Sequence, residues 1–127
     1  MHPLAIAAAL VAAGIHVWFF VLESVWFMRP SVWRRFGLTS DEEAGVVRSF
    51  AYNQGFYNLF LAAGVVIGIL LVATGDVASG RAIVLFACGS MVAAGVVLVS
   101  HNRELARAAA IQIVPALLAI AAIVTLS

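Results

Sequence analysis

Four long apolar runs, separated by short polar segments, set the pattern of hydrophobic and polar positions along this chain. An α-helix needs roughly 20 consecutive apolar residues to cross a bilayer. We predict four transmembrane helices, at residues 3–28, 41–73, 82–100 and 108–126. Short connections between consecutive helices favour antiparallel neighbours. The predicted fold is therefore all-α, a single domain over residues 1–127 that forms an integral membrane antiparallel four-helix bundle.

Local signals support the predicted helix ends. Arg29-Pro30 is predicted to stop the first helix, because proline restricts the residue before it and cannot continue the helical hydrogen bonds. Ser40, followed three residues later by Glu43, indicates a capping box in which each side chain bonds the other residue's backbone amide. The first run has no basic start and no small-residue cleavage site, so we expect it to remain as a helix and not to act as a signal peptide.

The composition agrees with a membrane protein and limits its chemistry. Hydrophobic residues make up 65% of the 127 residues and charged residues only 10%, with no lysine. The net charge of +1 gives no reason to expect nucleic acid as a partner. Cys88 is the one cysteine, so no disulfide is expected. Glu23 and His16 are too few for a metal site, and no nucleotide-binding motif is present, so we expect no cofactor.

The arginines predict the orientation in the membrane. Six of the seven fall in the first and third connecting segments or, for Arg48, in the part of the second helix that precedes the membrane. These regions lie on one side of an antiparallel bundle and hold Arg29, Arg34, Arg35, Arg48, Arg103 and Arg107. Positively charged loops face the cytoplasm. We therefore predict that both termini lie outside the cytoplasm.

Glu23 is the main candidate for function, because an ionisable group inside an apolar run is costly and usually functional. Glu23, Gln54 and Gln112 each lie five or six residues from an arginine at the cytoplasmic end of a helix. At a rise of about 1.5 Å per residue, each is roughly 8–9 Å inside the same boundary. These positions predict a polar layer across three helices.

Further polar and aromatic residues extend this candidate site. His16 lies seven residues before Glu23 and within about 20° of it around an α-helix, so we name both as candidate catalytic residues. Lipid offers carboxamides no hydrogen bonds, so the amides of residues 52–58 are expected to point into the bundle. The candidate substrate-binding residues are Asn53, Gln54, Tyr57, Asn58, Gln112, Trp18, Phe19, Phe20 and Phe27.

Simpler interpretations stay open for each of these groups. The amides could serve only as hydrogen-bonding contacts between helices. His16 could be a core histidine with satisfied hydrogen bonds, and the aromatic residues could serve packing alone. Small residues between Gly89 and Gly95 fit either a homodimer or packing within one chain.

Several of these motifs together resemble a known family. They are His16 and Glu23, the segments at 36–38 and 53–58, Leu61-Ala62-Ala63-Gly64, and Gln112 with Pro115-Ala116. The pattern resembles the DUF1304 family of small four-helix bacterial membrane proteins, described as a domain of unknown function. The resemblance implies the fold, the polar layer and a multi-pass place in the bacterial inner membrane. A weaker likeness, in site chemistry alone, is to emopamil-binding and sterol-isomerase proteins.

Three functions are consistent with these residues. The leading hypothesis is an acid/base isomerase or cyclase acting on a terpenoid-like or other lipophilic small molecule, in which Glu23 exchanges the proton. A carboxyl withdrawn from water favours its neutral form, so it can act as a proton donor. The second is a proton-coupled exporter resembling small multidrug transporters, although Glu23 lies away from the midplane that alternating access favours. The third is a non-catalytic subunit of a membrane complex.

Overall fold

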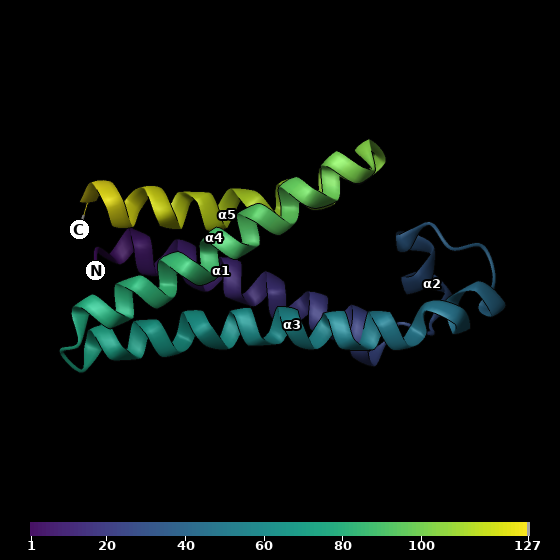
Figure 1. Ribbon diagram of the computed structural model, residues 1–127, viewed down its shortest axis with the longest axis horizontal. Coiled ribbons are helices and arrows are strands. Elements are labelled where there is room, and N and C mark those ends of the chain that lie inside the picture. The colour runs from purple at the N-terminus through teal and green to yellow at the C-terminus, as the bar shows by residue number, and fades with distance from the viewer. Residues whose placement is uncertain (127) are drawn as a thin grey trace. The chain divides into compact units, whose positions relative to one another are not determined.

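The structure, a computed structural model, describes residues 1–126 and contains helices but no strands within that range. Figure 1 shows the elements in chain order: α1 (Pro3–Phe20), the π-helical turn η1 (Val21–Val25), α2 (Pro30–Trp33), the 3₁₀ turn η2 (Arg34–Phe36), α3 (Asp41–Ala73), α4 (Val77–His101), the 3₁₀ turn η3 (Arg103–Leu105) and α5 (Ala106–Leu126). The predicted all-α class is confirmed.

Four helical stretches are long and apolar enough to cross a membrane. They are Pro3–Val25, Asp41–Ala73, Val77–His101 and Arg103–Leu126. The chain therefore has the helices of a multi-pass membrane protein.

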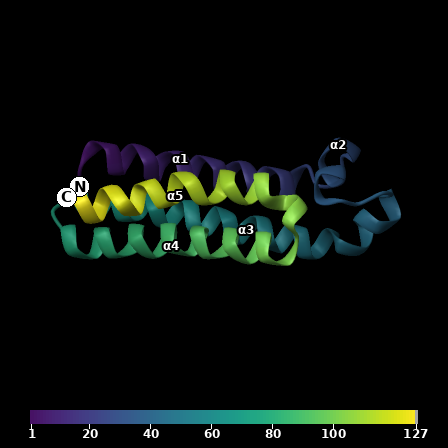
Figure 2. The same ribbon diagram turned by 90° about the horizontal axis from the view of Figure 1, so that it is seen from above.

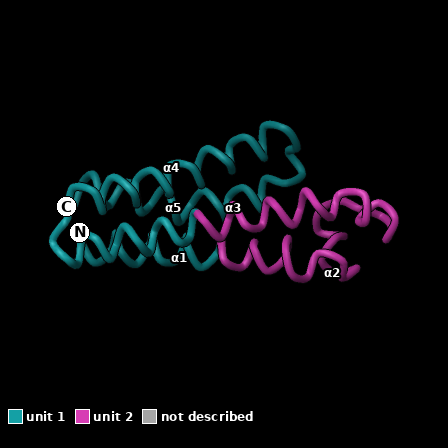
Figure 3. The backbone as a smooth tube through the Cα atoms, turned by 60° about the horizontal axis from the view of Figure 1, so that its bottom comes forward, with its two compact units in different colours: residues 1–15, 61–127 teal, residues 16–60 magenta. Residues whose placement is uncertain are grey.

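The chain divides into two compact units, coloured separately in Figure 3. Unit 1 combines residues 1–15 with the chain from residue 61 onward, and unit 2 is residues 16–60. The single domain expected from the sequence stays a prediction. Unit 1 holds most of the apolar core, and unit 2 holds Glu23 and its hydrogen-bond partner.

Unit 1 is an antiparallel four-helix bundle made from the start of α1, the second half of α3, α4 and α5. The beginning of α1 and the end of α5 lie at the same end as the α3–α4 turn (Figures 1 and 2). The connection between α4 and α5 lies at the opposite end (Figure 2). Consecutive helices thus run in opposite directions, as the short connections predict.

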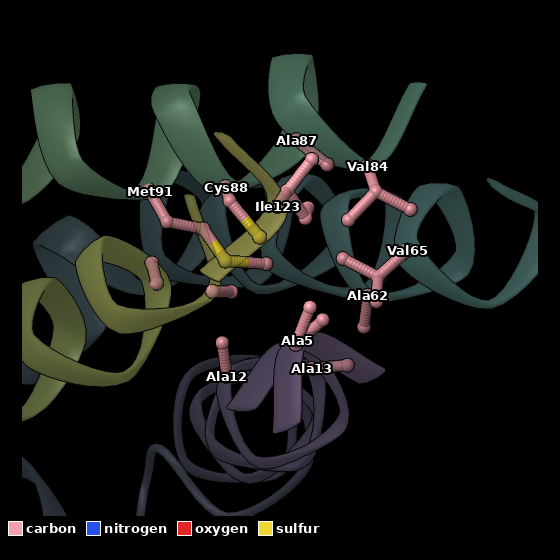
Figure 4. Close-up of a cluster of buried hydrophobic side chains, with 13 residues drawn as sticks. Ala5, Ala12, Ala13, Ala62, Val65, Val84, Ala87, Cys88, Met91 and Ile123 are labelled. Carbon is pink, nitrogen blue, oxygen red and sulfur yellow. The ribbon is translucent and has the colours of Figure 1, made fainter. Parts of the chain in front are cut away.

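The core of unit 1 is built from small side chains. From α1 it receives only alanines, at Ala5, Ala9, Ala12 and Ala13. Larger side chains from the other three helices point toward them (Figure 4): Val65, Val84, Cys88, Met91 and Ile123. Membrane helices gain little from the hydrophobic effect, so close van der Waals packing against small residues is what holds them together.

Helices α3 and α4 come close together at Gly68 and Gly80. A Cβ added to Gly68 would lie 2.8 Å from the Gly80 carbonyl oxygen, and one added to Gly80 would lie 2.7 Å from the backbone nitrogen of Val72. Only glycine lets the two backbones come this near. Arg81, one residue later, donates from Nη2 to the carbonyl oxygen of Ile123 at 3.1 Å and places a positive charge at the end of α5.

Helix α4 begins five residues before the predicted start at residue 82. The Asp76 side chain accepts a hydrogen bond from the Ser79 backbone N–H at 3.2 Å and so caps the helix there. The predicted boundary was wrong because it followed the apolar run, whereas a helix extends to its cap. Helix α5 likewise begins at Ala106, two residues before the predicted 108.

Helix α3 begins at Asp41, as the capping signal predicts. The Ser40 hydroxyl accepts a hydrogen bond from the Glu43 backbone N–H at 3.2 Å, which confirms one half of the capping box. The return contact differs from the prediction. The Glu43 carboxylate accepts from the backbone N–H of Thr39 at 2.8 Å and from the Thr39 hydroxyl at 3.0 Å, one residue before the cap.

The loop of unit 2 folds back onto the start of α3. Phe27, Trp33 and Ala44 form a small buried cluster, and the Trp33 indole N–H donates to the Asp41 carboxylate at 3.2 Å. At the end of η2, Gly37 adopts the left-handed backbone conformation with a φ of 81°, which suits glycine. These contacts fix the loop that joins the first span to the second.

The first helix ends earlier than predicted. Helical structure stops at Val25 instead of Met28, after a π-helical turn closed by a 2.8 Å bond from the Trp26 N–H to the Val21 carbonyl. Pro30 does not end this helix. It occupies the first turn of α2, where its missing N–H costs nothing.

Candidate functional site

The π-helical turn η1 is the local feature that sets the geometry around Glu23. In a π turn the backbone hydrogen bond spans five residues, which inserts an extra residue into the helix and rotates the side chains that follow. Glu23 and Ser24 both lie within this turn. The seven-residue spacing from His16 assumes an unbroken α-helix, so it no longer fixes the angle between His16 and Glu23.

Asn58 on α3 holds the Glu23 carboxyl. Its side-chain Nδ2 donates to Oε1 of Glu23 at 2.8 Å, and the two residues are 35 apart in sequence. Asn58 is buried and Glu23 is half-buried. A hydrogen bond of this length to a carboxyl is a strong one. The structure thus brings together the leading candidate residue and one of the predicted amides.

A second contact joins η1 to α3 beside the hydrogen bond between Glu23 and Asn58. The Ser24 hydroxyl donates to the Tyr52 carbonyl oxygen on α3 at 2.7 Å. Gly55 lies directly against it, since an added Cβ would overlap Ser24 Oγ and would lie 3.1 Å from the Ser24 backbone nitrogen. Sequence reasoning missed Ser24 and Gly55 as part of this site. The available signal was the lone glycine among bulky residues of segment 52–58.

Aromatic side chains surround the same helix pair, and each has a ring partner within the protein. Phe20 meets Phe56 at 5.1 Å between ring centroids, edge to face, and so also bridges the first span and α3. Phe27 is buried and meets Phe36 at 5.5 Å. Phe20 and Phe27 therefore contribute packing, and their roles in binding a substrate stay predictions.

Trp18 is 43% exposed and meets the Trp26 ring at 5.5 Å. Trp26 in turn stacks against the Arg29 guanidinium, whose carbon lies 4.3 Å from the ring centroid. Arg29 is thereby held against the Trp26 ring at the end of the first span. Binding of a substrate by Trp18 stays a prediction.

His16 is fully buried, and its ring meets that of Phe19 at 5.3 Å. Gln112 is also buried, on α5 in unit 1. Both side chains make interactions within the protein, as buried polar groups need to. Whether His16 takes part in catalysis, and whether Gln112 belongs to the polar layer, stay predictions.

Two of the predicted inward-facing amides are exposed. Asn53 and Gln54 are on the surface of the chain, and Tyr57 is 57% exposed. The expectation that all the amides of residues 52–58 point into the bundle is therefore wrong for Asn53 and Gln54. Asn58 alone among these three amides is buried.

The set of α3 residues that unit 2 buries explains why Gln54 is exposed. In unit 2, Ala44, Gly55 and Asn58 of α3 are buried, and Val47, Ala51, Phe56 and Leu59 are partly buried. Most of them recur at intervals of three or four residues, which is the spacing of one packed seam. Gln54 is about 40° around the helix from Asn58, on the side away from Gly55, so it lies at the edge of the seam, where it is exposed. The sequence spacing from Gln54 to Asn58 could not reveal where the seam ends.

One protein-family model matches this chain. The family described as Protein of unknown function (DUF1304) matches residues 10–124. This chain belongs to the DUF1304 family. The match to DUF1304 includes both Glu23 and Asn58 and extends from α1 to α5. Searches of curated proteins and of solved structures find no match for the chain.

The contacts of Glu23 in this DUF1304 chain determine which chemistry its carboxyl can support. In residues 1–126 no three histidine, cysteine or acidic side chains come together as metal ligands would. One carboxyl oxygen of Glu23 is held by Asn58, which leaves Oε2 as the natural position for a proton. Such a group can give a proton to a neighbouring molecule and take one back.

Proposed function

We propose that this membrane protein is an acid/base enzyme that shifts a double bond in a lipophilic small molecule, with Glu23 as the group that exchanges the proton. One observation supports the proposal above all others. A carboxyl within a membrane-spanning stretch has one oxygen fixed by an amide from the neighbouring helix. Intramembrane carboxyls mark functional sites because their cost must be offset by a use.

The proposed reaction balances without any co-reactant. The neutral Glu23 carboxyl donates its proton to one carbon of an alkene, which forms a C–H bond and leaves a carbocation on the adjacent carbon. The Glu23 carboxylate then removes a proton from the other neighbour of that cationic carbon. The electrons of the broken C–H bond form the double bond in its new position, and the neutral carboxyl is regenerated.

Asn58 and η1 have distinct supporting roles in this proposal. The amide N–H of Asn58 bonds most strongly to an ionised carboxylate, so it stabilises the state that follows proton donation. The π turn sets the direction in which Glu23 leaves its helix. π turns occur often at functional sites because they redirect side chains in this way.

Exchange with deuterated water tests the proposal even while the substrate is unidentified. The purified protein is placed in vesicles made from the lipid extract of its expression host and doped with an isoprenoid alcohol, in D₂O. Each round of protonation and deprotonation by Glu23 introduces deuterium into a lipid carbon, which mass spectrometry detects. We expect incorporation with the wild-type protein and with Glu42→Gln, an exposed glutamate outside the site.

Glu23→Gln should abolish the incorporation, because glutamine keeps the shape and an acceptor for Asn58 but cannot exchange the proton. Incorporation that persists in Glu23→Gln, or that is absent from the wild type, would overturn the proposal.

A cationic dye in the same vesicles separates the remaining alternatives. Flux driven by a proton gradient and lost in Glu23→Gln would indicate an exporter, and neither activity would indicate a non-catalytic subunit.

A further inference from the structure

One face of α3 carries polar groups that the chain itself does not cover. Phe50, Asn53, Gln54 and Tyr57 are all exposed and recur at the spacing that places residues on one side of a helix. We name these four residues the amide face. Neither Asn53 nor Gln54 makes a side-chain hydrogen bond within residues 1–126. The amide face is centred about 100° around the helix from the buried line that contacts η1.

The depth of this face makes its exposure costly. Arg48 is the last charged residue of α3, and Gln54 follows it by six residues. At about 1.5 Å per residue, Gln54 is roughly 9 Å deeper than Arg48. The headgroup layer is only about 5–8 Å thick on each side of the hydrocarbon core. Gln54 therefore reaches hydrocarbon, where a carboxamide without a hydrogen-bond partner is unfavourable.

We propose that the amide face is covered by the same face of a second copy of this chain, in a parallel two-fold dimer. A carboxamide is both donor and acceptor, so Gln54 can pair with its own equivalent. A two-fold axis along the membrane normal brings each residue opposite the same residue at the same depth. The face carries no charge, so self-association meets no repulsion. Membrane helices commonly associate through such amide contacts.

Cysteine cross-linking in vesicles tests the proposed dimer directly. The background is Cys88→Ala, because Cys88 is the one native cysteine. Phe50→Cys, which keeps both amides of the face, should form a disulfide-linked dimer on mild oxidation in purified protein at low density in liposomes. Tyr52→Cys is the matched control, since Tyr52 is also exposed on α3. It lies about 200° around the helix from Phe50 and differs from it in depth by only about 3 Å.

The proposal requires Phe50→Cys to cross-link and Tyr52→Cys to remain monomeric. Equal cross-linking at both positions, or none at Phe50→Cys, would overturn it.

A second measurement uses no cysteine. Gln54→Leu should weaken dimerisation in vesicles about tenfold, as measured by fluorescence energy transfer between labelled chains on dilution with lipid. Circular dichroism of Gln54→Leu should be unchanged because Gln54 is exposed, and an unchanged dimerisation constant would contradict the proposal.

Discussion

Gly55→Ala should separate the first span from α3 at the site of Glu23. The added Cβ would overlap the Ser24 hydroxyl oxygen, and it would lie 3.0 Å from Ser24 Cβ and 3.1 Å from the Ser24 backbone nitrogen. The hydroxyl can rotate away, but Cβ and the backbone cannot. The π turn must therefore move away from α3.

Two effects contribute to the loss of stability expected in Gly55→Ala. Rotation of the Ser24 hydroxyl breaks its 2.7 Å bond to the Tyr52 carbonyl. Loss of one such bond costs about 0.5–1.5 kcal/mol. Overpacking that displaces backbone costs about 1–3 kcal/mol. We expect the free energy of unfolding to fall by about 1.5–4.5 kcal/mol in Gly55→Ala. Ser24→Ala alone should lose only the first part, about 1 kcal/mol.

The assay is equilibrium unfolding in mixed detergent micelles, followed by circular dichroism. Gly45→Ala is the matched control, because Gly45 lies on the same helix and an added Cβ there would meet nothing within 4 Å. Gly45→Ala should leave stability unchanged or raise it by about 0.4–1 kcal/mol. If Gly55→Ala proved as stable as Gly45→Ala, the close approach at Gly55 would be refuted. Adding Ser24→Ala to Gly55→Ala should recover part of the loss, since one overlapping atom is removed.

Three further substitutions test other contacts by the same unfolding measurement. The Cβ of Gly68→Ala would lie 2.8 Å from a carbonyl oxygen of α4, whereas that of Gly89→Ala has open space. Gly68→Ala should therefore cost about 1–3 kcal/mol and Gly89→Ala should be neutral, and equal stability of the two would contradict the packing of unit 1. Ser40→Ala removes the cap of α3 and should cost about 1 kcal/mol. Trp33→Phe loses the 3.2 Å bond to Asp41. It should cost about 0.5–1.5 kcal/mol, and no loss would mean that this bond does not hold the loop.

The sequence was sufficient for the parts of the fold that depend on local rules. Apolar length predicts four spanning helices, and the Ser40 signal predicts the start of α3 at Asp41. The family resemblance is likewise confirmed. The start of α4 was missed because a helix outside hydrocarbon needs no apolar residues, only a cap such as Asp76.

The sequence singled out Glu23 and Asn58, which the structure joins by a hydrogen bond. It did not predict the positions of the residues around them. Glu23 stood out because a carboxyl in an apolar run has few structural uses, and Asn58 followed from the need to bond amides inside a bundle. Helical spacing relates Gln54 to Asn58 without showing the width of the buried seam, so it wrongly predicts Gln54 inside the bundle. The π turn could not be predicted, since no residue type specifies it and it depends on tertiary contacts such as Ser24 with Tyr52.

The most direct test of the proposed site is the contact between Glu23 and Asn58 in a lipid bilayer. Solid-state NMR of protein labelled with ¹³C at glutamate Cδ and ¹⁵N at asparagine Nδ2 measures that distance through dipolar recoupling. Glu23→Gln serves to subtract signals from the other glutamates. Asn58 Nδ2 lies 2.8 Å from the Glu23 oxygen. Nδ2 is therefore within about 4 Å of Cδ, so strong dephasing that disappears in Glu23→Gln is expected. Dephasing that is absent, or unchanged by Glu23→Gln, would show that the carboxyl is not held by Asn58 and would remove the basis of the proposed chemistry.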